Sequence, residues 1–206
     1  KNGNNLKIIG KTGRGPGEIQ SVSGMSFACE DQLMVSDAGN RRLTYFSTSG
    51  EWKRSIPMGT KMIARAVEDN EGNIIAQLLV IREEAKQEIV KFDSELNPLF
   101  KIASKVQEGW DDEFIMKPIK PLLSYGVTKE GDIIWGISSN YEVNILDSKG
   151  NLIKRIIKDI SPLVISNSYK KEIKEKYKNR NIPPNYKIEF PKYFTEFSFF
   201  VVEENG

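Results

Sequence analysis

The chain of 206 residues contains no histidine and only one cysteine, Cys29. Without histidine it lacks the side chain that most often acts as a general base near neutral pH and that completes serine and cysteine catalytic triads. A single cysteine excludes a disulfide within the chain, and its place in an apolar run favours a small buried side chain. Any catalysis would depend on carboxylates, lysine or tyrosine, so the composition disfavours an enzyme.

Long apolar runs and an excess of one charge are also missing. No run approaches the ~20 residues that cross a bilayer, so no membrane-spanning segment is predicted. The net charge is +2, and Glu172 and Glu175 interrupt the lysines of residues 170–176, which is typical of a solvated helix face. We therefore expect no nucleic-acid partner, which would need a concentrated basic face. Because the chain begins at Lys1 without a signal-peptide pattern, any targeting segment is expected outside this sequence.

What the sequence does contain is a repeat. Short runs rich in β-branched and aromatic residues alternate with turns that hold Gly, Asn or Asp, and groups of four runs recur. A four-stranded antiparallel unit at a period of roughly 40–60 residues is typical of a β-propeller blade. The sequence predicts an all-β propeller, as a single domain over residues 1–206, with three complete blades and the start of a fourth at residues 23–57, 63–103, 123–157 and 197–206. Since propellers usually close with four or more blades, we expect either part of a longer propeller or a ring completed by association.

Two insertions, residues 106–121 and 158–194, interrupt the repeat. In the second, Ser168 to Arg180 is predicted to form a short helix. Insertions in repeat proteins emerge as loops on one rim and often form the binding surface. In the first, Trp110 and Phe114 are candidate partner contacts, because exposed aromatic side chains often anchor partners; they could equally pin the insertion to a blade. The acidic residues 111–113 between them lack calcium-loop spacing and favour a solvated loop, so no metal site is predicted.

The stretch GKTGRGPGE, residues 10–18, resembles a phosphate-binding loop only superficially. The first glycine of that motif would fall at Asn5, and the motif must open a helix, which the glycines and Pro16 prevent. Gly15 and Gly17 are therefore interpreted as allowing a tight turn between blades. A structural role is likewise predicted for the turn residues Asp37, Asn40 and Arg42, which would close a turn and bridge adjacent loops.

Three segments carry a resemblance to a known family: residues 13–18 before a blade, residues 35–43 with their Asp-x-Gly-Asn-x-Arg turn, and residues 45–50. Together they resemble the NHL-type six-bladed β-propellers, especially the bacterial ones. The second and third blades keep the spacing of strands and turns but not the turn motif. The resemblance implies a six-bladed ring and favours an extracellular or cell-envelope location. It implies little about activity, because propellers host many unrelated functions.

Two inner-strand residues complete the candidate binding set. Arg65 aligns with Met25, Tyr125 and Phe200, and a charge among large apolar residues needs a partner or water. Arg65 would therefore either line the central channel as a ligand contact, with Tyr125 beside it, or pair with a carboxylate.

The leading hypothesis is a non-catalytic scaffold without a cofactor, which binds a protein or a small ligand through its rim insertions. The alternative is a lactonase-like hydrolase with a metal in the channel. That alternative needs inward carboxylates from several blades, and the inner strands offer only Glu68 and Asp69. A third possibility is one segment of a secreted or surface protein whose activity lies elsewhere.

Overall fold

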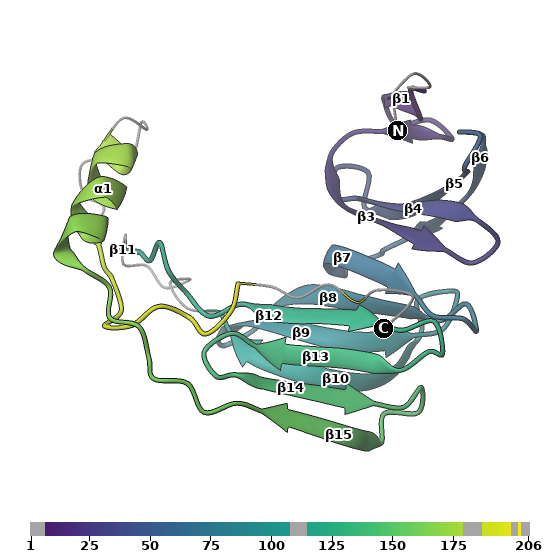
Figure 1. The fold of residues 1–206 in the computed structure, drawn as a ribbon. Coiled ribbons are helices and arrows are strands. Elements are labelled where there is room, and N and C mark those ends of the chain that lie inside the picture. Colours follow the sequence, from purple (N-terminus) through teal and green to yellow (C-terminus); the bar gives the residue numbers. More distant parts are fainter. Residues whose placement is uncertain (1–6, 108–114, 179–186, 199–201, 203–206) are drawn as a thin grey trace.

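The computed structural model describes residues 7–107, 115–178, 187–198 and 202. Three four-stranded antiparallel sheets follow one another along the chain, and the strand order in each sheet is the order of the sequence (Figure 1). The fold is all-β with propeller-type blades, as the repeat predicts. We call the three sheets blades 1, 2 and 3.

The blades have these strands. Blade 1 comprises β3 (Val22–Ala28), β4 (Gln32–Asp37), β5 (Arg42–Ser47) and β6 (Trp52–Pro57). Blade 2 comprises β7 (Met62–Glu68), β8 (Ile74–Ile81), β9 (Ala85–Phe92) and β10 (Pro98–Val106). Blade 3 comprises β12 (Leu123–Val127), β13 (Ile133–Ile137), β14 (Glu142–Leu146) and β15 (Leu152–Ile157).

The core lies between the blades, because a single four-stranded sheet cannot bury both of its faces alone. Between blades 1 and 2 the buried cluster includes Met34, Leu43, Tyr45, Ile74 and Phe92. A second cluster, which joins blades 2 and 3, is built around Ile75, Ile89, Leu123, Tyr125 and Ile133. Each blade therefore buries core residues against its neighbour.

Polar side chains also form hydrogen bonds between the blades, and the acceptors are backbone carbonyls. Ser26 Oγ donates to the carbonyl of Ala66 at 3.0 Å, which joins β3 to β7. The Tyr125 hydroxyl donates to the carbonyl of Arg65 at 2.9 Å, which joins β12 to β7. The first strands of neighbouring blades are thus linked directly.

The strand register defines which residues are equivalent in the three blades. In blade 1, Phe46 pairs with Leu33, which pairs with Phe27. In blade 2, Phe92 pairs with Ile74, which pairs with Glu68. In blade 3, Leu146 pairs with Ile133, which pairs with Val127. Glu68 therefore occupies a position at which the other two blades carry an apolar residue.

The same register corrects the alignment of Arg65. An irregularity in the pairing of β7 with β8 falls between Ile63 and Arg65. The pairing from Arg65 to Glu68 is regular, and Glu68, not Val67, is equivalent to Phe27 and Val127. Counting back two residues, Ala66 and not Arg65 is therefore equivalent to Met25 and Tyr125. Ala66 is 1% exposed, like a core residue, whereas Arg65 is exposed.

Small elements lie outside the blades. Two-stranded parallel pairs join β1 (Lys11–Thr12) to β2 (Glu18–Ile19) and β11 (Ile115–Met116) to β16 (Lys187–Ile188). The helix predicted in the second insertion is α1 (Asn167–Lys178), which Figure 1 shows apart from the blades. Within the described residues, no helix has the length and apolar character needed to span a membrane.

Candidate functional site

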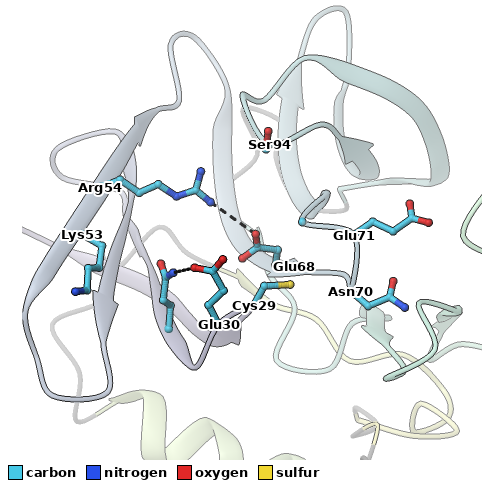
Figure 2. Close-up of a pocket in the computed structure, with 10 residues that line it drawn as sticks. Cys29, Glu30, Lys53, Arg54, Glu68, Asn70, Glu71 and Ser94 are labelled. Carbon is cyan, nitrogen blue, oxygen red and sulfur yellow. Dashed lines mark hydrogen bonds and ion pairs between the residues drawn. The ribbon is translucent and has the colours of Figure 1, made fainter.

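A cavity of about 510 Å³ opens between blades 1 and 2, at the end where β3 turns into β4 and β7 turns into β8. Its walls come from these two turns, from the beginning of β6 and from the β9–β10 turn (Figure 2). The lining residues are Cys29, Glu30, Gln32, Lys53, Arg54, Glu68, Asn70, Glu71, Gly72 and Ser94. The lining is mostly polar, so the cavity is suited to a polar ligand.

Glu68 is the unusual group in this cavity. Its side chain is only 4% exposed, and Oε1 lies 3.7 Å from Nη2 of Arg54. Oε2 is buried and has no hydrogen-bond partner among the described residues. Burial raises the pKa of this carboxyl, the Arg54 charge opposes the rise, and the charges of Asp69 and Glu30 add to it. A buried, incompletely paired carboxylate lowers stability, and such groups cluster at functional sites.

Arg54 covers the carboxylate of Glu68 from the solvent side. Its side chain is 46% exposed, and Figure 2 shows it pointing toward Glu68. Its Cζ atom also lies 4.2 Å from the centroid of the Tyr45 ring. The Tyr45 hydroxyl is buried without a hydrogen-bond partner among the described residues, and burial, together with the charge of Glu68, raises its pKa. Two incompletely satisfied polar groups therefore lie close to one exposed guanidinium.

Cys29, at the end of β3, is not a candidate nucleophile. Its Sγ donates to the carbonyl of Asp69 at 3.1 Å. Burial raises the pKa of the thiol, and the charge of Glu68 raises it further. Since the thiolate is the reactive form, this cysteine is a weak nucleophile at neutral pH.

The charges of the cavity are mixed. Glu30, Glu68 and Glu71 supply carboxylates, and Lys53 and Arg54 supply cations. A ligand that carries both hydrogen-bond donors and acceptors would find complementary groups here. Among the residues that the structure describes, no group of three or more His, Cys, Asp or Glu side chains could hold a metal ion.

The candidate residues Arg65 and Tyr125 lie together, but away from this cavity. Arg65 Cζ is 5.2 Å from the centroid of the Tyr125 ring, and its Nη1 donates to the Tyr125 carbonyl at 3.5 Å. Tyr125 is 1% exposed. The two residues join blades 2 and 3. The other candidates, Trp110 and Phe114, lie outside the described residues.

The glycine-rich stretch is fastened to blade 1 by the predicted turn residues. Asp37 accepts hydrogen bonds from the backbone amides of Gln20, Ser21 and Asn40. Asn40 Nδ2 donates to the Gly13 carbonyl at 2.9 Å, and Arg42 Nη2 donates to the Gly15 carbonyl at 2.6 Å.

Gly17 shows why this stretch needs glycine. Its φ is +71°, and a Cβ atom at this position would lie 2.9 Å from Cβ of Trp52. Any larger residue would therefore combine backbone strain with a clash. We find contacts between backbone and side chains in this stretch and no sign of a phosphate-binding geometry in the described residues.

Glu68 could have been recognised from the sequence. In the sequence, Glu68 is one of two carboxylates predicted on inner strands. Counting four residues back from the turn glycines Gly72 and Gly131 would have aligned Glu68 with Val127. A carboxylate at a repeated apolar position is the signal that identifies it.

No sequence profile of a known protein family matches the chain, and no curated protein matches it. Solved structures do. A Bacteroides fragilis protein that is thought to be exported matches 83% of this chain and 47% of its own length, at 11% identity and a TM-score of 0.53. This overlay shows a shared fold and nothing about activity.

Enzymes are among the weaker matches. Virginiamycin B lyase from Staphylococcus aureus matches 68% of this chain and 43% of its own length, at 10% identity and a TM-score of 0.36. A gluconolactonase from Xanthomonas campestris matches 67% of this chain and 62% of its own length, at 15% identity and a TM-score of 0.32. The chain spans less than two thirds of each of these three proteins.

Proposed function

We propose that this chain is part of a non-catalytic, NHL-like six-bladed propeller that binds a polar ligand or the polar side chains of a protein partner at its rim. The cavity between blades 1 and 2 would be the binding site. The observation that carries the proposal is Glu68, a carboxylate that is 4% exposed, incompletely paired and placed at an apolar position of the repeat.

The cavity residues would supply both acceptors and donors of hydrogen bonds to the ligand. Glu68 and Glu30 would accept hydrogen bonds from the ligand, and Lys53 and Arg54 would donate to it. Arg54 is half exposed and lies 3.7 Å from Glu68, so it can stay beside that carboxylate while its other N–H groups donate to a ligand. An extracellular or cell-envelope location belongs to the same proposal, and the likeness to the Bacteroides fragilis protein is compatible with it.

The proposal is tested by titrating the isotope-labelled protein with a panel of small sugars, polyols and amino acids and recording amide chemical shifts by NMR. We expect at least one compound to shift amides of the cavity residues Glu30, Glu68, Asn70 and Glu71. Ser94→Trp would fill the cavity and abolish these shifts. Lys149→Trp, on an exposed side chain of the equivalent turn of blade 3 and outside the cavity, would leave them unchanged. Shifts that persist in Ser94→Trp, or no shifts at all, would contradict the proposal.

The hydrolase alternative is not advanced, because no observation on the described residues favours it.

A further inference from the structure

A second cavity, of about 530 Å³, lies at the opposite end of the interface between blades 1 and 2. It is bounded by the beginning of β3, the β4–β5 turn, the link from β6 to β7 and the beginning of β7. Its lining residues are Ser23, Ala38, Arg41, Met58, Thr60, Lys61, Met62, Ile63, Ala64 and Leu79. Met58 and Ile63 are 2% and 3% exposed and belong to the core between the blades, so this cavity opens directly onto apolar packing.

The chemistry of this cavity differs from that of the first. Apolar side chains form most of its lining, and one of them, Met62, is 50% exposed although it is large and hydrophobic. Exposed apolar surface beside a concave site is typical of ligand binding. None of the described residues that line the cavity is acidic.

Two cationic side chains, those of Arg41 and Lys61, also line this mostly apolar cavity. Neither forms an ion pair with a described residue; Lys61 Nζ lies 5.9 Å from the centroid of the Phe92 ring. The carboxylate nearest to them in the sequence, Asp37, is fully buried and accepts hydrogen bonds from Ser21 and Asn40 instead. The positive charge at the cavity is therefore not neutralised by the described part of the chain.

We infer that this cavity binds an amphiphilic carboxylate, a small molecule with one carboxylate on an apolar chain. The apolar chain would lie against Met58, Met62 and Leu79, where it removes exposed apolar surface from water. The carboxylate would accept hydrogen bonds from Arg41 and Lys61, in the charge-assisted geometry that suits guanidinium and ammonium groups. This inference is independent of the polar site at Glu68, because the two cavities have no described lining residue in common.

The test is calorimetric titration of the protein with decanoate below its micelle-forming concentration. We expect saturable binding at one site. Decanol, which keeps the chain and lacks the charge, should bind about tenfold more weakly, and decyltrimethylammonium should not bind, because it brings a like charge to the two cations. Acetate should not bind, because it lacks the apolar chain.

Variants locate the site. Arg41→Gln and Lys61→Gln keep most of the length of each side chain, and each should weaken decanoate binding about tenfold while leaving decanol binding unchanged. Met62→Glu should abolish decanoate binding, whereas Met62→Leu should retain it. Lys53→Gln removes a cation from the cavity at the other end of the interface and serves as the matched control, with no expected effect.

Equal binding of decanoate and decanol would overturn the inference, and so would decanoate binding that Arg41→Gln and Lys61→Gln leave intact. Failure of this test would leave the polar site untouched, since its own titration uses different ligands and different variants.

Discussion

The ammonium group of Lys91 lies 2.8 Å from Oδ2 of Asp69, and both side chains are almost completely buried within blade 2. The same ammonium donates to the carbonyl of Ser148 in blade 3 at 2.7 Å. Asp69 also accepts hydrogen bonds from the amides of Glu71 and Asn73, so it closes the β7–β8 turn beside the polar cavity. One buried ion pair therefore fixes a turn of blade 2 and a contact between two blades.

Lys91→Met should strongly destabilise the protein. The substitution leaves the buried charge of Asp69 without its cation, which typically lowers the free energy of unfolding by about 3–5 kcal/mol. Urea denaturation followed by circular dichroism measures the change. Lys86→Met provides the control, because Lys86 pairs with the half-exposed Glu84 and such a pair contributes about 1 kcal/mol or less. Similar losses in the two variants would show that the ion pair is not a stabilising contact.

Tyr125→Phe should weaken the joint between blades 2 and 3. The Tyr125 hydroxyl lies 2.9 Å from the Arg65 carbonyl oxygen and 3.3 Å from the Ile75 carbonyl oxygen, and its single proton is shared between these two acceptors. Removing it leaves buried carbonyls without this donor, at a cost of about 1–3 kcal/mol in the free energy of unfolding. Tyr193→Phe, on a side chain that is 37% exposed, should change the stability little. The result would contradict our account if Tyr125→Phe were as stable as the parent.

Glu68→Gln should change the pH dependence of stability. Because the pKa of Glu68 is raised in the folded protein, folding takes up a proton at this group, and the stabilisation is greatest below its ordinary pKa of 4.5. This contribution is lost as the pH rises through the raised pKa. The free energy of unfolding of the parent should therefore fall relative to that of Glu68→Gln as the pH rises from the ordinary pKa of 4.5 through the raised pKa. A constant difference across that interval would show that Glu68 is not perturbed.

Asp37→Asn should show the opposite slope. Burial raises the pKa of Asp37, but the hydrogen bonds from Ser21, Asn40 and Gln20 outweigh it and leave the pKa lowered. Its stabilising contribution is therefore present above the ordinary pKa of 3.8 and lost as the pH falls through the lowered value. The advantage of the parent over Asp37→Asn should shrink in acid. Unfolding curves at a series of pH values measure both slopes, and slopes of the same sign in the two variants would refute this assignment.

The blades were predictable because their signal is local and repeated. Apolar runs separated by Gly, Asn and Asp turns fix strands and hairpins within some forty residues, and the structure has three four-stranded antiparallel sheets. The helix of the second insertion was predicted from Ser168 and begins at Asn167, with the Ser166 hydroxyl accepting a hydrogen bond from the Tyr169 amide. The prediction of a single domain, and most of the predicted fourth blade, are not tested by the described residues.

The candidate site was harder to predict, because it depends on register. The alignment expected from the sequence is one residue out in β7, so that Ala66 and not Arg65 lies in the row of Met25 and Tyr125. Glu68 then takes a place in the interface between the blades that sequence spacing alone gave to Val67. Both cavities are formed by residues from two blades, and their juxtaposition follows from how the sheets stack.

The hydrogen bonds between blades affect which residues of this protein can be replaced during evolution. Ser26, Tyr125 and Lys91 all donate to main-chain carbonyls of the adjoining blade. Every amino acid offers the same carbonyl, so the residue on the receiving side can be replaced without losing the bond. These hydrogen bonds therefore constrain only the donating side chain, whereas the apolar side chains packed between the blades are constrained on both sides.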